Sequence, residues 1–164
     1  MKYVGNIFNE EDYKKYCFMT VYEFVAYLPY ICLVDEFQEK IYSKANLKQE
    51  DINNTWLELV KKYNLEKSNT GHINLESGNY FFRQSHIYLN PFYYIDYALS
   101  YFGAFSLWDE CENNLDLFKK LGRVASYYSF KDLIDKYDMP NPFDKETVKN
   151  ITIKLENELE KYIN

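Results

Sequence analysis

Apolar residues recur every three or four positions through much of the chain, which is the spacing that lines up one face of an α-helix. Over residues 11–43 this spacing predicts one long helix, in which Pro29 is expected to cause a kink or a break. The apolar face of this helix consists of Phe18, Val21, Tyr22, Val25, Leu28 and Cys32.

A second helix is predicted over residues 47–64. Asn46 stands three positions before Gln49, an arrangement that can cap a helix start. The following loop, residues 65–79, is rich in Asn, Ser and Gly, and His72 within it is expected to be exposed. The apolar stripe of the second helix consists of Ile52, Trp56, Leu59, Val60 and Tyr63.

The second half of the chain also has helical periodicity. Residues 80–88 alternate too irregularly to predict a strand. A helix is predicted from Pro91 to about Leu121, with a weak point at Gly103. Its expected core face consists of Phe92, Ile95, Leu99 and Phe102.

Two capped helices are predicted near the C-terminus. Ser129 and Asp132 can cap a short helix that ends at Tyr137, and Asp144 can cap the last one. The pattern therefore predicts an all-α fold, with residues 1–164 forming a single helical domain. The buried stripe of the last helix is expected to be Val148, Ile151, Leu155, Leu159 and Tyr162.

Charge and cysteine content narrow the possible partners. The net charge of −6 disfavours nucleic acid and anionic membrane surfaces. The three cysteines include no C-x-x-C pair, which argues against a disulfide framework and against a thiolate zinc site. The apolar stretch 21–34 is too short for a membrane span, and the stretch 91–108 contains Asp96. We expect a cytoplasmic protein with no membrane partner.

The side chains most able to take part in binding or catalysis lie close together along the chain. On a helix that begins at Pro91, Tyr94, Tyr97 and Tyr101 would form one column, with Tyr93 beside Tyr97. The phenols either pack in the core, with each hydroxyl bonded to a carbonyl or to water, or form a donor-rich wall with His86 at its mouth. Such a wall can polarise a substrate, but it supplies neither a nucleophile nor an attacking water.

Ser85 is an unsuitable nucleophile for His86. We expect these adjacent residues to lie on an extended segment, where neighbouring side chains point to opposite sides. No carboxylate stands at a distance along the chain that would orient the imidazole. A catalytic dyad is therefore not predicted.

Several separated blocks resemble one enzyme family. The stretch FFRQSHIYLNPFYYIDYALSYFGAFSLW, residues 81–108, resembles the C-terminal signature of the zinc oligopeptidases related to oligoendopeptidase F and thimet oligopeptidase. The stretches FVAYLPYICLVDEFQEKIY (24–42) and TWLELVKKY (55–63) resemble the segment that precedes this signature. SFKDLIDKYDMPNPF (129–143) and the last helix resemble the family's ending. The likeness runs in collinear order from about Asp12 to the C-terminus.

The resemblance implies a mostly helical fold around a deep channel in which short peptides are cleaved. By matched position, His86, Tyr94 and Tyr97 would grip the substrate carbonyl, with Tyr93 and Tyr101 as further substrate-binding residues. Arg83 could clamp a peptide carboxylate, or form a salt bridge within the fold. We expect Asp35, Glu36 and Gln38, which match the family's D-E-F-Q block, to be structural.

The sequence lacks the zinc-binding motif of these enzymes. The family holds zinc with an H-E-x-x-H helix and a glutamate from the next helix, and this chain has no H-E-x-x-H. His72 and His86 stand 14 residues apart, with no cysteine or carboxylate placed to complete a site. The sequence is expected to begin after the zinc ligands, so the chain itself holds no metal and zinc belongs to the full-length family.

Two functions follow as hypotheses. The chain is either the C-terminal fragment of a zinc-dependent oligoendopeptidase, inactive alone, or a non-catalytic helical module that binds peptides or proteins. Its expected partners are short peptides and either a missing N-terminal peptidase segment or a second copy of itself. Whether it is a piece of a longer enzyme or a separately encoded remnant stays open.

Overall fold

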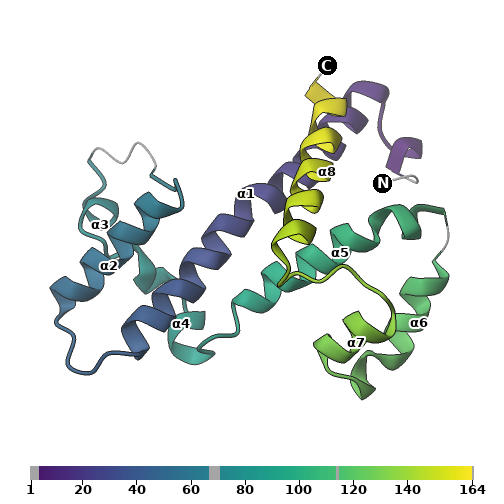
Figure 1. Cartoon of the computed structure of the whole chain (residues 1–164). Coiled ribbons are helices and arrows are strands. Elements are labelled where there is room, and N and C mark those ends of the chain that lie inside the picture. The colour runs from purple at the N-terminus through teal and green to yellow at the C-terminus, as the bar shows by residue number, and fades with distance from the viewer. Residues whose placement is uncertain (1–3, 67–70, 114, 164) are drawn as a thin grey trace. The chain divides into compact units, whose positions relative to one another are not determined.

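The computed structural model describes residues 4–66, 71–113 and 115–163 (Figure 1). All regular structure within these ranges is helical, which confirms the prediction of an all-α fold. Three 3-10 turns, η1 (Val4–Asn6), η2 (Tyr80–Arg83) and η3 (Ala125–Tyr127), accompany the α-helices. The α-helices are α1 (Glu10–Tyr42), α2 (Gln49–Lys62), α3 (Ile73–Glu76), α4 (His86–Leu89), α5 (Ile95–Asn113), α6 (Asp116–Val124), α7 (Phe130–Lys136) and α8 (Lys145–Ile163).

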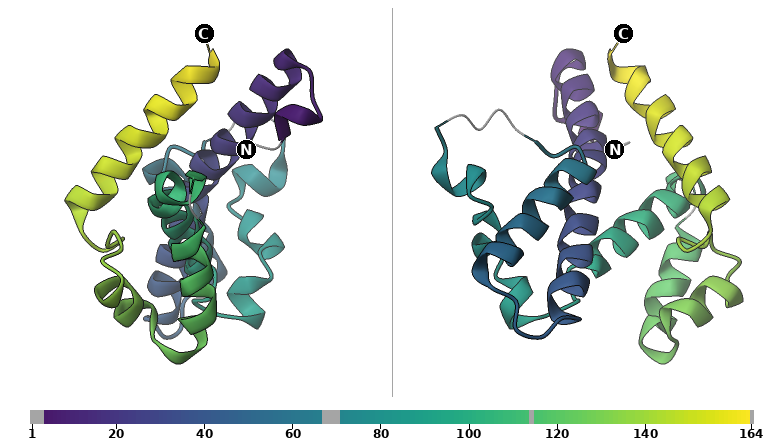
Figure 2. Two further views of the ribbon diagram at one scale, coloured as in Figure 1. Left: turned by 90° about the vertical axis from the view of Figure 1, so that its right-hand side faces the viewer. Right: turned by 60° about the vertical axis from the view of Figure 1, so that its left-hand side comes forward.

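The chain divides into two compact units. The first comprises Met1–Val25 and Leu99–Asn164, and the second comprises Ala26–Ala98. Helices α1 and α5 each contribute residues to both units. Figure 2 gives two further views of the ribbon, coloured by residue number. This division does not test the assignment of residues 1–164 to a single domain, which stays a prediction.

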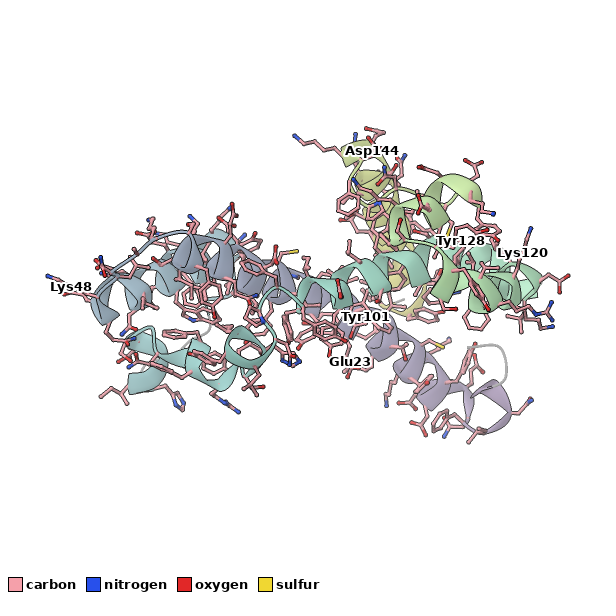
Figure 3. The ribbon with its side chains drawn as sticks, turned by 90° about the horizontal axis from the view of Figure 1, so that it is seen from below. Glu23, Lys48, Tyr101, Lys120, Tyr128 and Asp144 are labelled. Carbon is pink, nitrogen blue, oxygen red and sulfur yellow. The ribbon has the colours of Figure 1, made fainter. Side chains whose placement is uncertain are left out.

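The core of the first unit joins three helices. Val21 of α1, Phe105 of α5 and Leu155 of α8 are buried together. The Asp144 carboxylate, labelled in Figure 3, accepts the Thr147 N–H at 2.8 Å, which confirms the predicted cap of the last helix. The surrounding partly buried side chains are Phe24, Val25, Tyr101, Trp108, Ile151 and Leu159.

The core of the second unit is aromatic. Trp56 of α2 is only 2% exposed, and its ring centroid lies 5.0 Å from that of Phe37 and 5.9 Å from that of Phe81. Leu59 is buried beside it on the same helix face, as the predicted stripe requires. The second half of α1 contributes the fully buried Ile31, Leu33, Val34 and Phe37.

Two helix predictions near the N-terminus need correction. Helix α1 continues through Pro29, so the predicted break does not occur, while a kink at Pro29 stays a prediction. Helix α2 begins at Gln49, and the Asp51 carboxylate accepts the Lys48 N–H at 3.1 Å. Asn46 does not cap it, since its φ of 60° places it in a left-handed turn that Asn tolerates.

The helix predicted from Pro91 to Leu121 is shorter at both ends. Residues 91–94 form a turn in which Phe92 has a φ of 62°, α5 begins at Ile95, and it passes Gly103 without interruption. Phe92 is 48% exposed, so it does not belong to the core face. In the first unit that face consists of Tyr101, Phe105 and Trp108.

The segment between α2 and α5 contains more helix than the sequence predicts. Residues 73–76 of the predicted loop form α3, while residues 67–70 lie outside the described part of the chain. His72 is exposed, as expected. Residues 80–89 are mostly helical, because η2 and α4 place Phe81 and Ile87 into the core. Ser85 therefore does not lie on an extended strand.

Helix α1 is the one helix among the described residues that is long and apolar enough to cross a membrane, judged by length and composition alone. Core helices of soluble proteins meet the same criteria. In the second half of α1, four apolar residues are fully buried inside the second unit: Ile31, Leu33, Val34 and Phe37. The absence of a membrane partner stays a prediction.

Gln38 is the residue that fixes the turn before α5. It is fully buried, its Oε1 accepts the N–H of Phe92 at 2.8 Å, and its Nε2 donates to the Val34 carbonyl at 3.2 Å. A turn with a left-handed residue is costly unless its backbone groups are held. The buried amide therefore explains why the helix does not start at Pro91.

Replacing Gln38 by leucine should lower the free energy of unfolding by about 1–3 kcal/mol, because the Phe92 N–H loses its acceptor. Urea denaturation followed by circular dichroism measures this. Gln49→Leu is the control, since Gln49 bonds only to Asn53 on the surface of α2 and its loss should change stability by less than about 0.5 kcal/mol. Equal stabilities of the two variants would contradict the role of Gln38.

Candidate functional site

The segment that carries His86 is attached to α1 at several points. The Tyr42 hydroxyl donates a hydrogen bond to the Ile87 carbonyl, and the Ile87 side chain is fully buried. Gln38 holds the turn that follows, and the Tyr42 ring lies 5.8 Å from that of Phe92. These contacts bring α4 and the start of α5 together within the second unit.

His86 is surrounded by three phenol rings, and we call these four residues the His86 cluster: His86, Tyr93, Tyr94 and Tyr97. The imidazole centroid lies 5.0 Å from Tyr94, 6.0 Å from Tyr97 and 6.1 Å from Tyr93. Tyr97 in turn lies 5.3 Å from Tyr94 and 5.6 Å from Tyr93, both edge to face. The structure therefore brings together the imidazole and the three phenols that the sequence singled out.

The sequence predicted that the tyrosines form one column along a helix, but the structure brings them together from a turn and a helix. Tyr93 and Tyr94 lie in the turn before α5, and only Tyr97 lies on the helix. Tyr101 belongs to the first unit, where its ring packs edge to face against Phe24 at 4.6 Å (Figure 3). Substrate binding by Tyr101 stays a prediction.

Two tyrosines of α1 extend the cluster. The hydroxyls of Tyr27 and Tyr94 are hydrogen-bonded to each other, and the Tyr30 ring lies 6.2 Å from that of Tyr94. Tyr94 is 4% exposed, and burial followed by its bond to Tyr27 raises its pKa far above the usual value. The Tyr94 phenol is therefore protonated, and its hydroxyl is engaged with that of Tyr27.

The cluster has both a buried and an exposed side. Tyr94 is buried, whereas Tyr27 is 39% exposed and Tyr93 is 47% exposed. The interpretation in which all the phenols are core residues therefore holds for Tyr94 but not for Tyr93. A polar group of a ligand can reach the exposed rings from solvent.

Gln84 supplies the polar contacts of the imidazole. Its Nε2 lies 2.7 Å from His86 Nδ1, and its Oε1 accepts from the Tyr30 hydroxyl at 3.2 Å. Gln84, Tyr27 and Tyr30 were not predicted as site residues from the sequence. Tyr27 and Tyr30 stand at i and i+3 on a predicted helix, which shows a shared face, but only the fold shows what that face meets.

Arg83 is exposed and lies over a ring. Its guanidinium is 5.3 Å from the centroid of Tyr80, and it forms no salt bridge with any residue that the structure describes. A hollow of about 250 Å³ beside it is lined by Asn79, Tyr80, Phe82 and Arg83. Among the described residues Arg83 has no salt bridge, so both the internal salt bridge and the carboxylate clamp stay predictions.

Two residues of the D-E-F-Q block, Glu36 and Gln38, make contacts that hold parts of the fold together. The Glu36 carboxylate accepts from Lys62 at 2.6 Å and from the Tyr63 hydroxyl at 2.8 Å, which joins α1 to α2. Partial burial raises the Glu36 pKa, but the hydrogen bonds from Lys62 and Tyr63, together with the charges of Lys62 and Lys40, lower it below the usual value. Gln38 holds the turn at Phe92.

A comparison with solved structures relates this chain to a known protein, whereas the comparisons of its sequence do not. A scan against protein families finds no match, and no curated protein matches either. A solved structure described as PZ peptidase A with inhibitor 2 matches with a TM-score of 0.81 and 30% sequence identity. The match covers 94% of this chain and 28% of the peptidase chain. The all-helical fold of this chain is therefore related to that of one part of a peptidase.

Proposed function

We propose that this chain is the C-terminal, substrate-binding part of a cytoplasmic zinc oligopeptidase of the oligoendopeptidase F kind. The observation that carries the proposal is the His86 cluster, in which three phenols surround an imidazole within about 6 Å, in a chain similar to part of a peptidase. All three cysteines are free, which is consistent with a reducing compartment.

The chemistry available to the cluster is hydrogen-bond donation. A neutral imidazole N–H and a protonated phenol can both donate to the carbonyl oxygen of a peptide bond, and each bond strengthens as negative charge develops on that oxygen. Tyr94 is buried and its hydroxyl is bonded to that of Tyr27, so the exposed phenol of Tyr93 is better placed to meet a substrate. The cluster would thus bind and polarise a substrate.

In this proposal the zinc is bound by another segment of the peptidase. The described residues include no group of three or more His, Cys, Asp or Glu side chains that could hold one metal ion. The residues of this part of the chain therefore do not fit a zinc site, and we assign no step to zinc here.

The exposed apolar side chains of the first unit support the proposal that a partner covers its surface. Large apolar side chains are exposed there, including Tyr22 at 49%, Phe118 at 62% and Phe143 at 61%. The chain also spans only 28% of the peptidase structure that it matches. A missing N-terminal peptidase segment is the partner we propose, with self-association as the alternative.

A non-catalytic peptide-binding module is the second candidate function. The exposed rings of Tyr27 and Tyr93 favour it, because they can contact a bound peptide without any reaction. The two functions differ when a segment with an H-E-x-x-H helix is added: a peptidase part then cleaves peptide, whereas a binding module does not.

Both functions require the cluster to bind peptides. Short peptides should bind saturably to the chain, and Tyr93→Phe should weaken binding by about 2- to 12-fold, because the Tyr93 ring is 47% exposed and the variant loses one hydrogen bond of about 0.5–1.5 kcal/mol. Isothermal titration with a mixed-sequence peptide set measures this. Tyr127→Phe is the control, because Tyr127 is 79% exposed in the first unit and its variant should bind as the unchanged chain does. Peptide binding that Tyr93→Phe leaves intact would argue against the cluster as the site.

A further inference from the structure

Gln84 connects the half-buried phenol of Tyr30 to the imidazole of the His86 cluster. Its side-chain oxygen accepts from the Tyr30 hydroxyl at 3.2 Å, and its side-chain nitrogen lies 2.7 Å from His86 Nδ1. All three residues belong to the second unit. Two consecutive hydrogen bonds thus run from α1 to the ring.

The chemistry of the amide determines where the imidazole proton sits. An amide nitrogen can only donate, so His86 Nδ1 must accept from Gln84. A neutral imidazole carries one proton, and if Nδ1 accepts, that proton is on Nε2. His86 then offers a donor at Nε2 and no donor at Nδ1.

The structure turns the oxygen of the Gln84 amide toward Tyr30 and the nitrogen toward His86. The Tyr30 hydroxyl donates to that oxygen, and burial raises the Tyr30 pKa above the usual value. The Tyr30 ring is held between those of Trp56, at 6.3 Å, and Tyr94, at 6.2 Å. With the oxygen turned toward Tyr30, the amide nitrogen faces His86.

We infer that Gln84 is a positioning residue that fixes His86 as the Nε2–H tautomer, and that Tyr30 orients Gln84 for this purpose. The consequence for substrates rests on the proposed function: His86 would meet a peptide carbonyl with an N–H that is already in place. An imidazole with its proton on Nδ1 would instead present a lone pair at Nε2 and repel that oxygen.

Nitrogen NMR of the whole chain tests the inference, because only two histidines are present. With ¹⁵N-labelled histidine, at a pH about two units above the ordinary imidazole pKa of about 6.5, the shifts of the two ring nitrogens report the tautomer directly. His72, which is exposed, provides the tautomer mixture of an imidazole in solvent. We expect His86 to be almost entirely Nε2–H.

Gln84→Glu is the decisive variant, since a carboxylate of the same shape can only accept. It should convert His86 from Nε2–H to Nδ1–H, while His72 keeps its mixture. In Gln84→Leu and Tyr30→Phe, which also serve if Gln84→Glu does not fold, the His86 mixture should move toward that of His72. A purely structural role of Gln84 would leave the tautomer unchanged in every folded variant, and that result would overturn the inference.

A separate peptide titration distinguishes this inference from the proposed function. If Gln84→Glu converts the tautomer but the unchanged chain binds no peptide, the proposed function fails and the role of Gln84 stands. If peptides bind but His86 keeps its tautomer in the folded variants, Gln84 does not position His86 and the proposed function stands.

Discussion

Replacing His86 by alanine should remove most of the peptide cleavage that appears when this chain is combined with a segment carrying an H-E-x-x-H helix. The loss should be about 100- to 1000-fold in kcat, the usual effect of deleting one donor to a developing oxyanion. The imidazole contacts three phenols and Gln84, and in the proposed role it is a donor that alanine does not replace. A fluorogenic peptide assay of the combined segments, run with saturating zinc, measures the loss.

The chain provides a matched control for this experiment. His72→Ala removes the other histidine, which is exposed and stands apart from the four residues of the cluster, so its cleavage rate should equal that of the unchanged chain. The chain without the added segment should not cleave the peptide. Chelator-sensitive turnover by the isolated chain, or an equal loss in the two histidine variants, would refute the proposal. In that proposal this chain supplies substrate contacts and the added segment binds the zinc.

Replacing Gly78 by alanine should strongly destabilise the second unit, although it adds only one methyl group. Gly78 has a φ of +73°, and a Cβ built on it would lie 2.5 Å from the Asn53 carbonyl oxygen and 3.1 Å from Leu57 Cγ, both on α2. The left-handed conformation costs a non-glycine residue about 1–2 kcal/mol, and the overlap with a helix backbone adds to this. We expect a total loss of about 3 kcal/mol or more in the free energy of unfolding.

Gly71→Ala separates the two causes of that loss. Gly71 also has a positive φ, of +91°, but a Cβ there would meet nothing within 4 Å. Its variant should therefore lose only the conformational part, about 1–2 kcal/mol. Urea denaturation of both variants measures the difference, and equal losses would show that Gly78 does not make a close approach to α2.

The same substitution should affect the site. Gly78 lies just before η2, which leads through Gln84 to His86. A shift of this turn away from α2 would alter the hydrogen bond between Gln84 and His86. Peptide binding by a folded Gly78→Ala protein should therefore be weaker than that by Gly71→Ala.

Local patterns in the sequence determined most of the helices. The stripe on α2 predicted the burial of Trp56 and Leu59, and Ser129 and Asp132 predicted the cap of α7. These features depend on residues three or four positions apart, which are neighbours in any helix regardless of the fold. The sequence also indicated His86, Tyr94 and Tyr97, through the residues that resemble a peptidase signature.

Only the tertiary structure decided how those residues meet. The start of α5 at Ile95 depends on the buried amide of Gln38, which stands 54 residues before the backbone N–H of Phe92 that it binds. The orientation of His86 depends on Gln84 and Tyr30, which are also 54 residues apart, and the pairing of Tyr27 with Tyr94 spans 67 residues. Periodicity describes which face of a helix a residue occupies, but contacts between distant segments are fixed by packing, because burial of polar groups is favourable only where a partner is in reach.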